Sequence, residues 1–118
     1  MAKLTKQLER LRDSGGLQDI DLELCRFLDD RSPDASEKVL LAACLVSYLY
    51  RQGDVCLQVP KYADSVLFEE NGLSLTIEAP EQEAWLQALK ESSLVGSPGA
   101  FKPLILDESD RLYMHKLW

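Results

Sequence analysis

The chain has 118 residues, of which 46% are hydrophobic and 28% charged, and its net charge at pH 7 is −7. This size and composition are typical of one globular domain and exclude a disordered chain. They also exclude a transmembrane helix. The longest uncharged run, Val39 to Tyr50, is far shorter than the ~20 apolar residues of a membrane span.

The charge is unevenly distributed along the chain. Residues 1–12 contain four basic residues and one acidic residue, so this segment carries +3 and the remainder −10. A domain that binds nucleic acid by itself needs a basic face to neutralise phosphates. Lys3, Lys6 and Arg10 would share one face of the first helix and could make a minor phosphate contact. We favour a solvated face instead, opposite a leucine stripe.

Two amphipathic helices are predicted at the start of the chain. The first covers residues 2–13 and is ended by the glycine pair at 15–16; its buried stripe is Leu4, Leu8 and Leu11. In the second, Asp19 can act as the cap and the helix runs to about Asp30. Its expected inward residues are Leu24, Phe27 and Leu28.

A third helix is expected to form the centre of the core. Ser32 can cap it, and Pro33 suits the first helical position. The helix would run to Gln52, and Gly53 would stop it. Residues 39–46 are apolar almost all round, which is typical of a helix buried on every side.

The middle of the chain gives weaker signals. Residues 54–59 predict a strand that Pro60 ends, and the strict alternation over residues 73–78 predicts another strand or extended segment. Residues 61–72 are ambiguous. Within them, Ser65 to Glu70 fits either a helical turn or one half of a hairpin closed at Asn71-Gly72.

The last third predicts one helix and a hairpin. Pro80 opens the helix, whose buried stripe is Trp85, Leu86 and Leu89. Residues 92–102 are expected to be a loop, and residues 104–106 and 112–114 two strands joined by a polar turn. The predicted fold class is therefore α+β. The amino-terminal half is mostly helical, and a small antiparallel sheet includes the carboxy-terminal hairpin.

No residue pattern predicts catalysis. His115 is the only histidine and has no nucleophile motif directed at it.

The three cysteines lack zinc-site spacing, and we expect Cys44 and Cys56 to be small buried side chains in a helix and a strand. The acidic run Asp19, Asp21 and Glu23 is expected to lie on a solvated helix face. The glycine-rich stretch 96–102 lacks the Gly-Lys-Ser/Thr ending of a phosphate loop. No catalytic residue, cofactor or metal is therefore predicted.

The segment from Trp85 to Trp118 nevertheless resembles a known family. The runs that carry the resemblance are Trp85-Leu86-Gln87-Ala88-Leu89, Ser92-Ser93-Leu94-Val95-Gly96, Pro103-Leu104-Ile105-Leu106-Asp107, Arg111-Leu112-Tyr113-Met114 and, at the end, Trp118. The helix at 40–50 followed by Gly53-Asp54-Val55-Cys56-Leu57 fits as well. Together they are similar to the amino-terminal domain of RecD, the alpha subunit of exodeoxyribonuclease V. The resemblance covers residues ~36 to 118 and is weakest over 60–80.

The resemblance implies a subunit of an ATP-driven 5′-to-3′ DNA helicase. Such a subunit works with RecB-type and RecC-type subunits in double-strand break repair by homologous recombination. Its motor, with ATP and Mg²⁺, would lie outside these residues. We therefore expect residues 1–118 to form one non-catalytic domain that docks onto a RecC-type partner and reaches DNA through the intact complex. We also expect a cytoplasmic location without membrane contact, since residues 1–12 have no signal-peptide character.

Leu112, Tyr113 and Trp118 are the candidate contact residues of such a domain, because they would lie where the chain passes into the next domain. The alternative is that Leu112 and Tyr113 fill the local core. Two other functions also stay open: a stand-alone acidic adaptor, and a small DNA-binding module of helices and a hairpin. The second needs a basic recognition helix, and only the first helix is basic. An unknown enzyme is a third possibility with no motif behind it.

Overall fold

Helices dominate the first half of the chain, and short strands are interspersed with helices in the second. The computed structural model describes residues 2–13, 15–32, 36–67 and 77–114, and among residues 2–5 it describes only the side chain of Leu4. Its elements are α1 (Ala2–Asp13), α2 (Asp19–Arg31), α3 (Glu37–Arg51), β1 (Leu57–Gln58), α4 (Val59–Tyr62), β2 (Val66–Leu67), β3 (Ile77–Glu78), α5 (Gln82–Glu91), β4 (Val95–Gly96), β5 (Leu104–Leu106) and β6 (Arg111–Met114). The predicted α+β class is confirmed.

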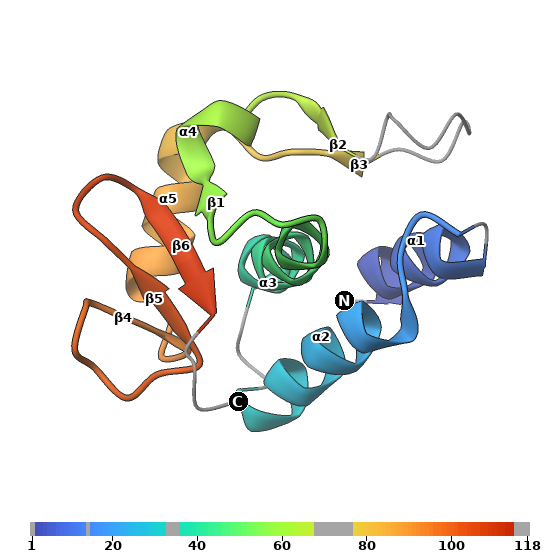
Figure 1. Cartoon of the computed structure of the whole chain (residues 1–118), viewed down its shortest axis with the longest axis horizontal. Helices are drawn as coiled ribbons and strands as arrows, with labels where there is room; N and C mark the ends of the chain where they lie inside the picture. The colour runs from blue at the N-terminus through green and yellow to red at the C-terminus, as the bar shows by residue number, and fades with distance from the viewer. Residues whose placement is uncertain (1, 14, 33–35, 68–76, 115–118) are drawn as a thin grey trace.

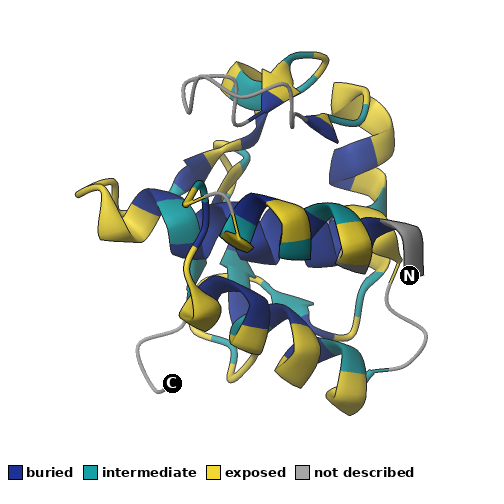
Figure 2. Ribbon diagram, turned by 90° about the vertical axis from the view of Figure 1, so that its right-hand side faces the viewer, coloured by how far each residue is buried: buried dark blue, intermediate teal, exposed yellow. Residues whose placement is uncertain are grey.

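α3 is the central helix, as the sequence predicts. Residues 39–47 are all buried, because side chains suited to the core cover the whole circumference of this segment. α2 packs along one side of α3, and α5, β1 and β6 contact it from the other side (Figure 1). α1 contacts α2 and extends the helical layer. Figure 2 shows exposed residues interspersed with buried ones along the helices, as expected of helices with one face in the core.

The sheet lies across α3 from the helical layer, and its strand order is β1-β6-β5-β4 (Figure 1). β5 and β6 form the predicted antiparallel hairpin, in which Leu106 faces Leu112 and Leu104 faces Met114. β1 pairs with the other edge of β6, with Leu57 opposite Leu112. β4 runs parallel to β5. Leu57, Leu104 and Leu112 have no exposed surface, so the hairpin is anchored in the core.

A second, two-stranded sheet joins β2 to β3 in antiparallel register. Of the ambiguous segment Ser65 to Glu70, Val66 and Leu67 are therefore paired as the hairpin interpretation predicts, and residues 68–70 lie outside the described residues. The predicted turn at Asn71-Gly72 lies outside the described residues. Only Ile77 and Glu78 of the alternating segment 73–78 are described, and they form β3.

α5 is tied to α3 by a buried tryptophan. The Trp85 side chain has no exposed surface, and its indole N–H donates a hydrogen bond to the Lys38 carbonyl at 2.9 Å. Leu86 and Leu89 are buried on the same face, as predicted. A buried indole needs a partner for its N–H, so this bond fixes how α5 sits on α3.

Three predicted helix starts are wrong by a few residues. α2 includes Asp19, and its cap position is Gln18. α3 begins at Glu37, and Ser36 rather than Ser32 caps it by accepting a hydrogen bond from the Val39 N–H at 3.4 Å. Residues 33–35, which include the predicted Pro33 start, lie outside the described residues. α5 begins at Gln82, two residues after Pro80.

Two predicted boundaries in the second half are also wrong. The expected strand 54–59 contains regular pairing only at residues 57–58, and Pro60 lies in the first turn of α4 instead of ending a strand. The expected loop 92–102 contains β4, whose pairing with β5 is parallel. Proline suits a first helical turn because its missing N–H would have no intrahelical partner there.

Candidate docking groove

A groove opens between α2, α3 and the carboxyl-terminal end of β6. Its volume is about 510 Å³, and its apolar lining is Ile20, Leu24, Phe27, Tyr50 and Met114. Ile20 and Tyr50 are each 61% exposed and Phe27 is 44% exposed. Clustered exposed apolar side chains typically mark a contact surface on a small domain. The groove is therefore the candidate functional site.

The groove exists because α2 carries two apolar stripes. One stripe is buried in the core and consists of Leu22, Cys25 and Leu28. The other consists of Ile20, Leu24 and Phe27, spaced i, i+4 and i+7, and lines the groove. The prediction that Leu24, Phe27 and Leu28 face inward is confirmed for Leu28 and wrong for Phe27. Leu24 is half-buried.

A buried carboxylate holds α2 against α3 beside the groove. Asp21 has no exposed surface, and its oxygens accept hydrogen bonds from the Gln18 N–H at 3.0 Å and the Ser47 hydroxyl at 2.6 Å. They also accept from the Arg51 guanidinium, which forms an ion pair with Asp21. The expectation that Asp21 lies on a solvated helix face is therefore wrong.

This network positions two polar residues of the groove. Ser47 and Arg51 both line it, and both bond to Asp21. A fully buried carboxylate that keeps several hydrogen-bond donors is costly to disrupt, so the network rigidifies one wall. A sequence signal existed: Asp21 shares the i, i+4, i+7 face with Cys25 and Leu28, and Arg51 follows Ser47 by one helical turn.

The remaining charged residue of the groove is acidic. Glu23 lines the groove and is exposed. The Arg51 charge is directed at Asp21, so the groove presents an apolar floor with a carboxylate at its rim. Arg31, at the end of α2, is exposed as well, and its guanidinium lies over the Phe27 ring, 5.5 Å from the ring centroid.

The predicted contact residues have three different placements. Leu112 is fully buried between β1 and β5, so it belongs to the local core and presents no surface to a partner. Tyr113 is half-buried and donates its hydroxyl hydrogen to Asp107 at 3.2 Å. Trp118 and His115 lie outside the described residues. A partner contact through Tyr113 or Trp118 stays a prediction.

Asp107 organises the hairpin turn next to Tyr113. One carboxylate oxygen accepts hydrogen bonds from the N–H groups of Ser109 and Arg111, at 2.9 and 3.0 Å. The other accepts from the Arg111 guanidinium at 2.9 Å. Burial acts to raise the pKa of Asp107, but these bonds and the Arg111 charge outweigh it and lower the pKa from 3.8. Burial is also the main reason that the pKa of Tyr113 is raised.

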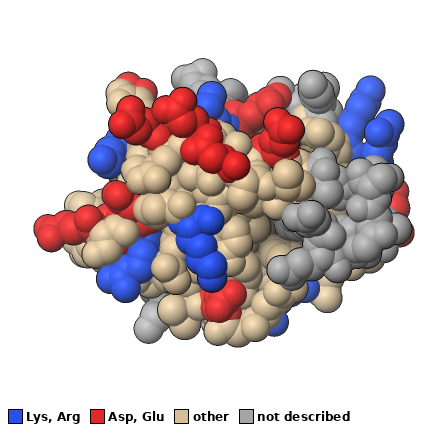
Figure 3. Space-filling model, turned by 90° about the horizontal axis from the view of Figure 1, so that it is seen from above, with Lys and Arg blue, Asp and Glu red and all other residues tan. Residues whose placement is uncertain are grey.

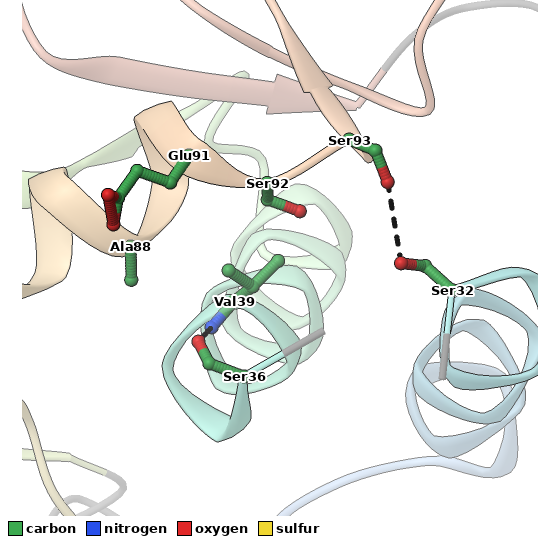
Figure 4. A pocket seen from close by; sticks show the side chains of 7 residues that line it. All are labelled: Ser32, Ser36, Val39, Ala88, Glu91, Ser92 and Ser93. Carbon is green, nitrogen blue, oxygen red and sulfur yellow. Dashed lines mark hydrogen bonds between the residues drawn. The ribbon is translucent and has the colours of Figure 1, made fainter. Parts of the chain in front are cut away.

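A second cavity, of about 430 Å³, is rich in serine hydroxyls (Figure 4). The Ser32 and Ser93 hydroxyls approach each other to 3.4 Å and join the end of α2 to the segment after α5. Ser36 caps α3, and Ser92 accepts a hydrogen bond from the Leu94 N–H. These hydroxyls are thus engaged in holding local structure together.

The cysteines divide by burial. Cys25 and Cys44 are buried free thiols, whereas Cys56 is half-buried. Cys44 is the small buried side chain that the sequence predicts. Cys56 precedes β1 instead of lying within a strand, so that part of the prediction is wrong. Burial raises the pKa of the Cys25 thiol to about 11 and that of Cys44 well above 9.0.

The described residues contain no cluster of three or more His, Cys, Asp or Glu side chains that could hold a metal ion. Among the helices of the described ranges, none has the length and apolar character to cross a membrane.

By fold, the chain is of the α+β class, with an apolar groove on one face. Its sequence matches the family described as "RecBCD enzyme subunit RecD, N-terminal domain" over residues 13–113. The match covers most of the chain, so the chain belongs to the RecD amino-terminal domain family, as the sequence resemblance indicates. No curated protein matches the chain significantly.

Proposed function

We propose that this chain is the partner-docking, non-catalytic amino-terminal domain of a RecD-type subunit of exodeoxyribonuclease V. The family match over residues 13–113 carries the proposal, since the family is named for a subunit of the three-subunit RecBCD enzyme. In this proposal the domain seats the subunit against a RecC-type partner and places it next to a RecB-type subunit. The helicase motor, with its ATP and Mg²⁺, belongs to another part of the subunit.

The surface of the domain supports a protein contact more than a DNA contact. Acidic side chains gather on the face seen from above (Figure 3). Exposed Asp64, Glu78, Glu81 and Glu83 occur within the segment from α4 to α5. Such a face repels phosphates. Of the basic first-helix residues, Lys6 and Arg10 are exposed, whereas Arg12 pairs with Asp13 and Asp19. The side chain of Lys3 lies outside the described residues.

The test is co-purification of the 118-residue chain with the RecC-type and RecB-type subunits of its own genome. We expect the tagged chain to retain the RecC-type subunit after size-exclusion chromatography. A chain that elutes alone at micromolar concentrations of both proteins contradicts the docking function and favours a stand-alone adaptor.

Two further measurements test the absence of catalysis and of direct DNA binding. The pure chain is expected to show no DNA-stimulated ATP hydrolysis and no salt-dependent binding to duplex DNA. Measurable ATPase activity would refute the non-catalytic assignment. Salt-dependent DNA binding would instead favour the DNA-binding module, because phosphate contacts are weakened by salt.

A further inference from the structure

The groove between α2, α3 and β6 has the form of a receptor for one helix. Ile20, Leu24 and Phe27 form a ridge along α2 about 10 Å long, at 1.5 Å per residue. Tyr50 and Met114 line the same groove from α3 and β6. Amphipathic helices bind apolar grooves through anchors spaced i, i+3 or i+4, and i+7. Two turns of such a helix match the length of the ridge.

The charges around the groove limit which charges a bound partner can carry. Glu23 is exposed within it, and the Arg51 guanidinium is paired with Asp21. The exposed Arg31, at the end of the same helix, places its guanidinium over the Phe27 ring, 5.5 Å from the ring centroid, so Glu23 marks the acidic part of the rim. An occupant that places a lysine or arginine opposite Glu23, beside its apolar anchors, complements this carboxylate. A second copy of the chain complements it poorly, since each copy carries a net charge of −7.

We propose that this groove receives an amphipathic helix of the RecC-type subunit, with an apolar stripe and a basic residue opposite Glu23. The inference rests on the proposed docking function and adds the location and chemistry of the contact. It moves the expected contact from the end of the hairpin to α2 and α3, because Leu112 is buried whereas Ile20, Phe27 and Tyr50 are exposed.

The first experiment compares two matched substitutions in the 118-residue chain. Phe27→Asp introduces a charge into the groove, and Phe101→Asp makes the same change at an aromatic residue that is 84% exposed outside it. Binding to the purified RecC-type subunit is measured by isothermal titration calorimetry. We expect Phe27→Asp to weaken binding about tenfold or more, as at an interface hot spot, and Phe101→Asp to change it less than about twofold.

The second experiment tests the charge of the rim. Glu23→Lys is expected to weaken binding several-fold, with a larger effect at low salt, whereas Asp30→Lys on the same helix has a smaller effect. Glu23 and Asp30 are both exposed, so neither substitution disturbs the core. Circular dichroism and thermal unfolding of every variant confirm that each one folds.

The outcomes separate this inference from the proposed function. If the unaltered chain does not bind the RecC-type subunit, both are overturned. If it binds and Phe27→Asp is no weaker than Phe101→Asp, the docking function stands and the groove assignment is overturned. If the unaltered chain forms a dimer that Phe27→Asp dissociates, while RecC-type binding is unchanged, the groove joins two copies and the inference is overturned.

Discussion

The three cysteines differ in burial: Cys25 and Cys44 are buried, and Cys56 is half-buried. At pH 8 we expect a disulfide-exchange reagent such as DTNB to modify Cys56 in the native chain, and to reach Cys25 and Cys44 only after unfolding. Thiolate is the reactive form, and both buried thiols have a raised pKa. A Cys56→Ser variant should show no fast-reacting thiol. Fast modification of that variant at pH 8 would contradict the burial of the other two.

The same burial predicts how stability changes at alkaline pH. In the unfolded chain a cysteine ionises near pH 9.0, whereas native Cys25 ionises near 11. The stabilising contribution of this group is therefore complete below pH 9.0 and is lost as the pH rises through about 11. Urea unfolding at pH 8 and pH 10 measures the effect. When the pH rises from 8 to 10, a Cys25→Ala variant should lose less of its free energy of unfolding than the unaltered chain does.

Asp107 has the opposite dependence on pH. The pKa of Asp107 is lowered in the native state. Its contribution to stability is therefore present above pH 3.8 and is lost as the pH falls through the native pKa. Asp107→Asn should cost about 1 kcal/mol at pH 7. Measured by urea unfolding, the difference in stability between this variant and the unaltered chain should be smaller at pH 3. Glu108→Gln removes a charge from the same turn and serves as the control. A difference that is equal at both pH values would refute the role of ionised Asp107.

At the scale of the element, the end of α3 depends on one glycine. Gly53 follows the helix with φ +98°, and the N–H groups of Gly53 and Asp54 donate to the carbonyls of Tyr50 and Leu49. Residues with a side chain are strained in this conformation. Gly53→Ala should lower the free energy of unfolding by about 1 kcal/mol. Gln52→Ala, one residue earlier with φ −90°, should have little effect. Equal effects would contradict this explanation.

The joint between α2 and α3 depends on the buried carboxylate. Asp21→Ala should destabilise the chain by about 3 kcal/mol, because it leaves Ser47 and Arg51 without their acceptor beside the core. Glu23→Ala, two residues later on the exposed face, should cost less than about 0.5 kcal/mol. Chemical denaturation of both variants makes the comparison. An Asp21→Ala variant as stable as Glu23→Ala would show that the network contributes nothing to stability.

Sequence patterns predicted where the helices and strands lie better than they predicted which side chains of each helix are exposed. α3, the buried stripe of α5 and the hairpin of β5 and β6 follow directly from apolar spacing. The two stripes of α2 could not be ranked, because Leu24 and Phe27 are as apolar as the buried Leu22 and Cys25. Only the position of α3 decides which stripe is covered. The groove was missed for that reason.

Tertiary pairing also explains the other errors. β4 is two residues long, and each of its residues pairs with a β5 residue nine positions later in the sequence, so no local pattern predicts it. Asp21 looked like a solvated acid because its donors Ser47 and Arg51 belong to another helix. Short-range signals describe caps and stripes, whereas these features depend on contacts between elements.

At the scale of the whole molecule, the apolar groove and the strong net charge have opposite effects on self-association. The groove favours self-association, and the charge of −7 at neutral pH opposes it. Loss of the charge should therefore let copies associate through exposed residues such as Ile20 and Tyr50. The isoelectric point calculated from the sequence is about 4.6.

We expect the chain to be a 13.3 kDa monomer at pH 7 and to self-associate as the pH approaches 4.6. Sedimentation velocity at several pH values measures the change. Ile20→Ser leaves the charge unchanged and removes an apolar side chain from the groove, so it should reduce association near pH 4.6. Val55→Ser, at a residue 71% exposed outside the groove, should not. A salt-independent dimer at pH 7 would show that the net charge does not keep copies apart.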